Sequence, residues 1–358
     1  MSTPTSLELP NGVRRTTIRT ARGAFAALEA VPGSGVCERD AALLVPGYTG
    51  SKEDFLAILD LLADGSRHVI AIDMRGQFET ASAENPAGYA AAALGADILA
   101  IMHTTGARHL VGHSYGGLIG REAVLAGTGA EFASFTLMSS GPRALTGPRA
   151  KDLRAMLAIL GVGGGGRGRS DGGPGGDRSD GGSHGARPGG GANGEPGGRV
   201  DGGPGGRADG GPGGGRPDKA TLRAGIAELW QAHLEPQAIA AGVPGHIVAF
   251  LGRRMLGNDP DGLVLMAAHM LAAPDRTAEL ARLDQLPMLV IYGENDNSWS
   301  PAAQENMARR LGARRLCIPA AVHSPAVEAP ATTASALTQF WDAAEATHPA
   351  ATAARGAR

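Results

Sequence analysis

The sequence predicts an α/β fold, with a mainly parallel central sheet, helices on both faces and an inserted helical lid. Short apolar runs alternate with segments whose apolar residues recur at helical spacing, as in strand–helix–strand units. The apolar run at 108–111 is followed by a glycine-rich turn and then by a helical pattern at 118–125. Between the runs at 135–138 and 288–292 lie helical segments at 143–160 and 218–283, and we expect them to cover the carboxyl edge of the sheet.

The expected strands are short apolar runs bounded by turn residues. A turn at Arg22-Gly23 joins an opening pair, and several of the later runs have the continuous apolar character of strands buried on both faces. In chain order the expected strands are 16–20, 25–29, 41–45, 68–73, 108–111, 135–138, 288–292 and 315–318.

The expected helices carry apolar residues at three- and four-residue spacing. The first, 53–63, carries Phe55, Leu59 and Leu62 in this way, and Ser51 can cap it. The other core helices are 86–104, 118–125, 301–311 and 332–344; those of the lid are 151–160, 219–233, 246–255 and 262–271.

These patterns divide the chain into four kinds of segment. They are an α/β core at 1–142 and 284–346, a helical lid at 143–160 and 218–283, a Gly/Arg/Asp/Pro-rich insertion at 161–217 and a flexible tail at 347–358. The insertion repeats Asp-Gly-Gly-Pro-Gly-Gly at irregular spacing and has too little apolar surface to offset its ordering entropy, so we expect it to be disordered. An arginine–glycine segment that binds nucleic acid is the alternative, but the aspartates offset much of its charge.

Composition excludes several classes of partner. A net charge of -2 over 358 residues argues against nucleic acids and anionic membranes. The apolar stretch 89–102 is too short to cross a bilayer and contains Asp97, and residues 1–10 lack a signal-peptide pattern. Cys37 and Cys317 are expected to be free, buried thiols. We therefore expect a cytoplasmic protein that binds a small molecule; the oligomeric state is left open.

The turn at Gly112-His113-Ser114-Tyr115-Gly116 is the strongest local signal. A serine between a strand and a helix is held in a strained conformation, with its Oγ clear of the sheet. The flanking glycines allow strand and helix to approach closely. The free N–H groups at the helix start suit a developing oxyanion. The pattern predicts a nucleophile at Ser114; the alternative is a glycine-rich turn with an incidental serine.

A serine hydroxyl needs a general base, which a carboxylate orients. Both partners should follow strands at the edge of the sheet where Ser114 stands, in the order serine, acid, histidine. Asp296 follows the strand 288–292, and His323 follows the strand 315–318. We expect these three residues to form a catalytic triad.

Competing residues fit less well. Glu294 shares the acid loop but lies in the turn itself, and His109 and His113 are expected to be structural. His269 lies in the lid, and Asp73 is expected to brace a loop together with Arg75. No group of His, Cys, Asp or Glu has metal-ligand spacing, so we expect no metal.

Acyl transfer also requires donors for an oxyanion. The residue after the nucleophile supplies one, the backbone N–H of Tyr115. The other is expected from the loop after the strand 41–45, as the backbone N–H of Tyr48, because Gly47 lets that loop approach the substrate.

These motifs together resemble those of the α/β-hydrolase fold family. The matching segments are Leu44-Val-Pro-Gly-Tyr48, Asp73-Met-Arg-Gly76, the Ser114 turn, Tyr292-Gly-Glu-Asn-Asp296 and Val322-His323-Ser-Pro325. The resemblance implies Ser114, Asp296 and His323 as triad and Tyr48 and Tyr115 as oxyanion donors. Two departures are visible: Pro46 precedes Gly47 where relatives often have histidine, and Val322 precedes His323 where they often have glycine.

The resulting hypothesis is a cofactor-independent serine hydrolase acting on an ester, thioester or related acyl bond of a small apolar substrate. Phe78, Trp299, Met266 and Met270 are candidates for the substrate pocket. The alternatives are a perhydrolase or haloperoxidase-like activity on the same triad, and a non-catalytic ligand-binding protein of the same fold.

Overall fold

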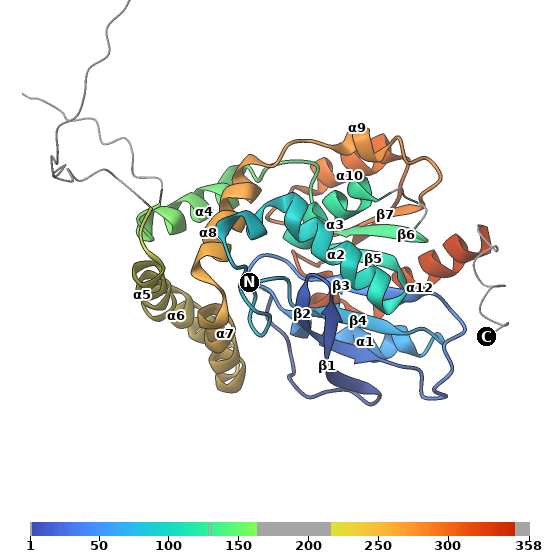
Figure 1. The fold of residues 1–358 in the computed structure, drawn as a ribbon, viewed down its shortest axis with the longest axis horizontal. Helices are drawn as coiled ribbons and strands as arrows, with labels where there is room; N and C mark the ends of the chain where they lie inside the picture. Colours follow the sequence, from blue (N-terminus) through green and yellow to red (C-terminus); the bar gives the residue numbers. More distant parts are fainter. Residues whose placement is uncertain (1, 128, 130, 163–215, 348–358) are drawn as a thin grey trace, which may run out of the picture. The chain divides into compact units, whose positions relative to one another are not determined.

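The computed structural model, which describes residues 2–127, 129, 131–162 and 216–347, contains an eight-stranded sheet in the order β1-β2-β4-β3-β5-β6-β7-β8. β2 is antiparallel to both of its neighbours, β1 and β4, and the strands from β4 to β8 run parallel (Figure 1). The strands are β1 (Val13–Thr20), β2 (Gly23–Ala30), β3 (Ala41–Val45), β4 (Val69–Ile72), β5 (Ala107–His113), β6 (Ser134–Met138), β7 (Met288–Gly293) and β8 (Arg314–Ile318).

The predicted fold class is confirmed, and the strands lie within a few residues of the predicted runs. β3, β4, β6 and β7 are buried along their whole length, as their continuous apolar sequences require. β8 is different, because it forms the edge of the sheet and most of its side chains are exposed.

Helices cover both faces of the sheet. α2 (Ala91–Thr105) and α3 (Tyr115–Ala126) pack together over one face, and α10 (Pro301–Leu311) contributes to the same apolar core. α1 (Leu56–Ala63) and α12 (Pro330–Thr347) pack over the other face, beside the short α11 (Pro325–Glu328). The two separate cores lie on opposite faces of one sheet, as expected of a parallel α/β architecture.

Two predicted core helices begin with a turn of different geometry. The first starts as a 3₁₀ turn, η1 (Lys52–Phe55), before α1, and Ser51 is its N-cap as predicted. The second is divided into η2 (Pro86–Tyr89) and α2, because Ala90 between them has extended backbone angles of φ -60 and ψ 144.

The inserted helices α4, α5, α6, α7 and α8 lie together beside the sheet (Figure 1). Their apolar residues continue the core on the α2/α3 face, so this lid is packed onto the sheet domain. The segment predicted as one helix at 219–233 is a helix followed by a π-helical turn and a further helix. The elements are α4 (Gly147–Ile159), α5 (Lys219–Leu229), the π-helical turn η3 (Trp230–Leu234), α6 (Glu235–Ala240), α7 (Gly245–Gly257), α8 (Pro260–Ala272) and α9 (Thr277–Leu280).

The segments predicted to be disordered or flexible, 161–217 and 347–358, lie outside the described residues except at their ends. Cys37 and Cys317 are free, but both are exposed, which corrects the prediction that they are buried; Cys317 lies on the edge strand β8.

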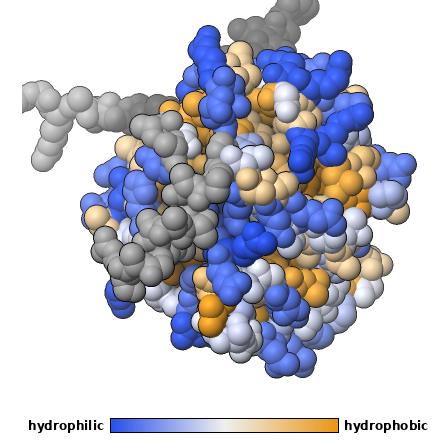
Figure 2. Space-filling view, turned by 90° about the vertical axis from the view of Figure 1, so that its right-hand side faces the viewer, coloured by the Kyte–Doolittle hydropathy of each residue, from blue (hydrophilic) through white to orange (hydrophobic). Residues whose placement is uncertain are grey.

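Within the described ranges, no helix combines the length and apolar character needed to cross a membrane. Figure 2 shows the face toward the carboxyl end of α12, where polar residues surround smaller, separate apolar areas.

Candidate active site

The turn between β5 and α3 holds Ser114 in a conformation that few residues adopt. Its φ of 53 and ψ of -117 lie outside the favoured regions, and its N–H donates to Met138 O at 2.8 Å. A Cβ on Gly112 would lie 2.4 Å from Gly116 O, and one on Gly116 would lie 2.5 Å from both Val45 O and Pro46 O. Both glycines are therefore required by close backbone approach, as the sequence predicted.

Ser114, His323 and Asp296 come together in one hydrogen-bonded chain. His323 Nε2 lies 2.9 Å from Ser114 Oγ, and His323 Nδ1 lies 3.0 Å from Asp296 Oδ1. Their loops follow β5, β7 and β8, whose carboxyl ends meet at one edge of the sheet. The three residues singled out from the sequence are thus in contact, in the arrangement that general-base activation of a serine requires.

The carboxylate of Asp296 is held from several sides. It is 6% exposed, and it accepts hydrogen bonds from Ser298 N and Gln304 Nε2, each at 2.9 Å. Burial raises the pKa of Asp296, but the hydrogen bond and charge of His323 and the bonds from Ser298 and Gln304 outweigh it and hold the pKa below its usual value. Asp296 is therefore ionised at neutral pH and can stabilise a protonated His323.

The loop after β3 lies against the nucleophile. A Cβ on Gly47 would stand 3.1 Å from Ser114 Cβ and 3.3 Å from His113 Nδ1. Tyr115 is the first residue of α3, so its N–H has no acceptor within that helix. The N–H of Tyr48 makes no backbone hydrogen bond in the described part of the chain. Gly47, which precedes Tyr48, and Tyr115 both adjoin Ser114, and the role of the two N–H groups as oxyanion donors stays a prediction.

Two residues that the sequence did not connect with His323 hold its backbone. His113 Nε2 lies 2.7 Å from His323 O. Glu328, in α11, accepts hydrogen bonds from the N–H groups of Val322, His323 and Ser324. No local pattern indicated either contact, although His113 was expected to be structural.

A cavity of about 500 Å³ opens at Ser114 and His323. Trp299 and Met270, two of the predicted pocket residues, line it. Phe78 and Met266 do not line this cavity: Phe78 packs edge-on against Phe250, and Met266 is buried in the core beneath the lid.

The rest of the cavity wall is mixed in character. Apolar side chains come from the loop before α4 and from α4, α5, η3 and α7, and exposed polar side chains come from α4, η3 and α6. The apolar residues include Leu145, Leu153, Met156, Leu229, Leu234 and Met255; the polar residues on those elements are Arg149, Asp152, His233 and Gln237.

The competing acids and histidines lie elsewhere. Glu294 accepts from Ala320 N on the surface, and His269 is half-buried, edge-on to Tyr115. Asp73 does brace a loop, but with Lys52, whose Nζ lies 2.9 Å from Asp73 Oδ2. Arg75, the partner predicted for Asp73, instead pairs with Asp97.

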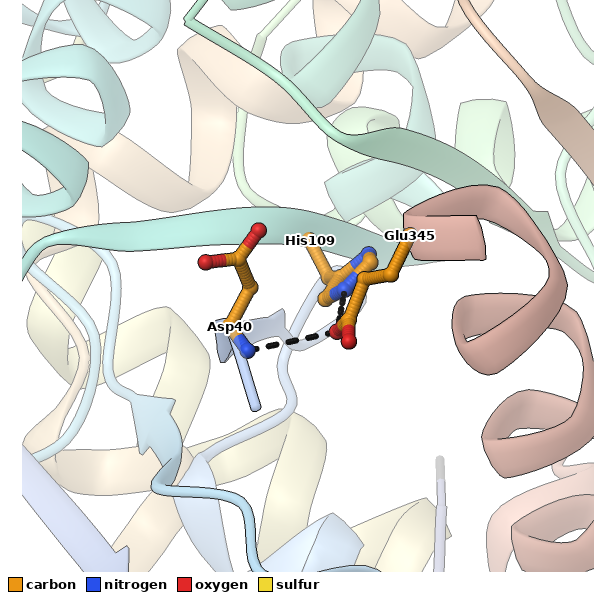
Figure 3. A group of neighbouring side chains, drawn as sticks. All are labelled: Asp40, His109 and Glu345. Carbon is orange, nitrogen blue, oxygen red and sulfur yellow. Dashed lines mark hydrogen bonds and ion pairs between the residues drawn. The ribbon is translucent and has the colours of Figure 1, made fainter. Parts of the chain in front are cut away.

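One group of described side chains has ligand atoms close enough for a metal ion, Asp40, His109 and Glu345, with the atoms within 4.8 Å of one another (Figure 3). Arginines already pair with both carboxylates: Arg67 with Glu345, and Arg108 with Asp40. His109 Nε2 lies 2.9 Å from Glu345 Oε1, and Asp40 offers Glu345 its backbone N–H while its carboxylate points away. These contacts form an ion-pair network that joins α12 to β5.

Comparison with known proteins agrees with this architecture. Residues 41–158 match the family model described as the alpha/beta hydrolase fold. A curated protein of Variovorax paradoxus, named "Putative carbamate hydrolase RutD", is 35% identical over 131 residues, which are 35% of this chain. The chain spans about half, 47%, of the length of that relative.

Solved structures show the same fold over most of the chain. A thermophilic esterase from Thermogutta terrifontis is 19% identical, with a TM-score of 0.60, over 92% of this chain and 99% of that one. An enol-lactonase from Burkholderia xenovorans is 16% identical, with a TM-score of 0.57, over 91% and 99% of the two chains.

Proposed function

Because the chain has the α/β-hydrolase fold, we propose that it is a serine hydrolase that cleaves an ester, thioester or related acyl bond. The observation that carries this proposal is the chain of contacts from Asp296 through His323 to Ser114, with distances of 3.0 and 2.9 Å. An ionised, buried carboxylate, a histidine and a strained serine in this order are the parts that acyl transfer needs.

In the first half of the reaction, Ser114 Oγ attacks the carbonyl carbon while its proton passes to His323 Nε2. Asp296 stabilises the protonated histidine, and the N–H groups of Tyr48 and Tyr115 receive the oxyanion. His323 then gives the proton to the leaving alcohol, thiol or amine, and Ser114 keeps the acyl group. In the second half, a water molecule loses a proton to His323 and attacks the acyl carbon. The bond between Ser114 Oγ and that carbon then breaks, His323 returns the proton to Ser114 Oγ, and the acid is released.

The cavity supports an apolar substrate of modest size. Its volume of about 500 Å³ falls in the range of small-molecule sites, and leucine and methionine side chains from the inserted helices form much of the apolar part of its wall. A carbamate is also an acyl compound that a serine can attack, and the name of the Variovorax relative places carbamates among the substrates to test. Esters and carbamates with short apolar groups are therefore the first candidates.

A fluorophosphonate probe, followed by peptide mass spectrometry, tests the nucleophile. We expect one labelled residue, Ser114, with no labelling in Ser114→Ala. A panel of acyl esters of increasing chain length, together with thioesters and carbamates, then defines the preferred bond. Folded protein that neither takes up the probe nor turns over any substrate would indicate a non-catalytic ligand-binding protein.

The acid is tested by a matched pair of variants. Asp296→Asn should lower kcat by about 10⁴-fold, because His323 loses the group that fixes its tautomer. Glu294→Gln should change kcat little, because the one side-chain hydrogen bond of Glu294 within the described residues comes from Ala320 N, on the surface. The reverse order of effects would overturn the assignment of Asp296.

A further inference from the structure

The side-chain amide of Gln77 joins the loop after β4 to the loop after β3. Its Nε2 donates to Gly47 O at 2.9 Å, and its Oε1 accepts from Met74 N at 3.1 Å. The side chain is 1% exposed. The orientation of the amide is fixed, because a flipped amide would set its oxygen against Gly47 O and its nitrogen against Met74 N–H.

The carbonyl that Gln77 holds belongs to the peptide unit of a proposed oxyanion donor. Gly47 C=O and Tyr48 N–H are parts of one planar trans peptide and point in opposite directions. Fixing the direction of the carbonyl therefore fixes the direction of the Tyr48 N–H. Gly50 N–H also donates to Gly47 O, at 3.1 Å, so two donors hold this carbonyl.

Both loops contain backbone strain that needs external support. Thr49 has a φ of 58, and Phe78 has a φ of 39, in the left-handed region that residues with a Cβ seldom adopt. Such conformations persist only where the surroundings determine them, and they concentrate at functional sites. Without the bond from Gln77, the Gly50 N–H is the one donor to Gly47 O, among the described residues, that still holds the Gly47–Tyr48 peptide unit.

The loop that carries Gln77 is itself well anchored. Gln77 N–H donates to Met74 O at 2.9 Å, and Thr80 N–H donates to Gln77 O at 2.8 Å. Gly76 is bonded on both sides, from its N–H to Ala81 O at 3.0 Å and from Asp259 N–H to its carbonyl at 2.8 Å. The backbone of Gln77 is therefore held in place, and so is the side chain that contacts Gly47.

We propose that Gln77 is a positioning residue for the oxyanion hole, which aims the Tyr48 N–H at the developing negative charge by holding Gly47 C=O. This inference rests on the proposed serine-hydrolase function. Gln77 touches neither the substrate nor the triad in this scheme. It acts through one peptide unit, and it should therefore affect the transition state more than the bound substrate.

Gln77→Met removes the amide while keeping an unbranched side chain of similar length. Loss of a whole oxyanion donor lowers kcat about 10²–10³-fold, and a misdirected donor should cost less, about 10–100-fold. KM should change little. A trifluoromethyl ketone inhibitor, whose adduct with serine carries an oxyanion, should bind more weakly by about the same factor as kcat/KM falls.

Gln77→Glu allows a second measurement, the pH dependence of kcat relative to the wild type, which simple destabilisation would not change. An ionised carboxylate sets an oxygen against Gly47 O, whereas a protonated carboxyl can donate to that oxygen as the amide does. The ratio of kcat in Gln77→Glu to kcat in the wild type should therefore be highest at low pH and fall as the pH rises. Taking the ratio removes any pH dependence that both proteins share.

Thr80→Val is the matched control in the same loop. Thr80 Oγ1 donates to Asp73 O at 3.0 Å and accepts from Ala26 N at 2.9 Å, so its loss lowers stability without touching Gly47. The melting temperature should fall, and the affinity for the trifluoromethyl ketone should stay unchanged.

The outcomes separate the two proposals. Suppose that the wild type is active and labelled at Ser114, but the folded Gln77 variants bind the inhibitor as tightly as the wild type. If the ratio of kcat in Gln77→Glu to kcat in the wild type also does not vary with pH, the role of Gln77 is overturned and the proposed function stands. If Gln77→Met does not fold, Gln77→Glu decides, because it keeps the bond to Met74 N. Wild-type protein without labelling or turnover would overturn the proposed function, and the role of Gln77 with it.

Discussion

His113 Nε2 lies 2.7 Å from the backbone carbonyl oxygen of His323, and the two rings are 5.2 Å apart. His113 ends β5, directly before Ser114, so the strand that presents the serine also holds the backbone of the histidine next to it. Burial, and then the charge of His323, lower the pKa of His113 to about 3. His113 is therefore neutral near pH 7, and its Nε2–H donates to the carbonyl.

We predict that His113→Leu lowers kcat by about tenfold and destabilises the protein by about 1–3 kcal/mol, because a part-buried carbonyl loses its donor. Steady-state kinetics and urea unfolding measure the two effects. His109→Leu is the control, since His109 lies on the same strand but bonds to Ser134 and Glu345. His109→Leu should lose stability and keep the kcat of the wild type. If His109→Leu and His113→Leu lose kcat equally, a specific role for His113 is refuted.

The sequence allowed the sheet and the three residues of the Ser114–His323–Asp296 chain to be predicted because each has a local signal. Ser114 lies in a strand–turn–helix pattern, and Asp296 and His323 each follow an apolar run. Parallel strands bring their carboxyl ends to one edge, so positions far apart in sequence converge without further information.

The residues that support the site could not be predicted in this way. Gln77 and Gly47 are 30 residues apart, and His113 and His323 are 210 apart. These bonds depend on how the loops pack in the folded protein, and no periodic sequence pattern predicts which residue a single Gln or His contacts. The pairing of Asp73 with Arg75 was wrong for the same reason: Lys52, 21 residues from Asp73, reaches it across the loop.

Arg254 connects the lid to the sheet domain. It is fully buried in α7, and its NH1 lies 2.6 Å from Asp54 Oδ1, while its NH2 donates to Ser2 O at 2.7 Å. Arg254→Met should destabilise the protein by about 3–5 kcal/mol, because it leaves Asp54 buried without its counter-charge.

Urea unfolding of Arg254→Met measures this loss. Its neighbour Arg253 is exposed on the same helix, and Arg253→Met should stay within about 0.5 kcal/mol of the wild type. A small loss in Arg254→Met would show that the lid does not depend on this ion pair.

Glu345 should make stability depend on pH. Burial raises its pKa, but bonds from His109 and Arg67 and the charges of both outweigh burial and lower the pKa to about 2 from an ordinary 4.5. Because the pKa is lower in the folded state, the stabilisation is complete above about pH 5 and is lost as the pH falls towards 2.

At 1.36 kcal/mol per pKa unit the stabilisation by Glu345 amounts to about 3 kcal/mol. We expect Glu345→Gln to be less stable than the wild type at pH 7, and the difference to shrink between pH 5 and 2. Unfolding by urea at several pH values measures it. The half-exposed Glu305, paired with Arg315, is the comparison: Glu305→Gln should differ from the wild type by no more than about 1 kcal/mol. A difference for Glu345→Gln that does not vary with pH would contradict this account.

Met266 and Met270 lie one turn apart on α8, so their spacing does not show which one faces the substrate. The structure separates them, because Met270 lines the cavity beside Ser114 and Met266 is buried in the core. Met270→Ala enlarges the cavity, and an apolar pocket distinguishes substrates by about 1–3 kcal/mol per methylene. We therefore predict a shift of kcat/KM towards longer acyl chains, by about 10-fold or more for one added methylene, with labelling of Ser114 retained.

Met266→Ala is the matched control for this prediction. It should lower stability by about 2–5 kcal/mol, as large-to-small changes in a core do, and leave the chain-length preference unchanged. Ratios of kcat/KM across a series of acyl esters, measured for both variants beside the wild type, decide the matter. A shift in Met266→Ala without one in Met270→Ala would mean that the acyl group occupies a different part of the lid, and that the cavity beside Ser114 receives the leaving group instead.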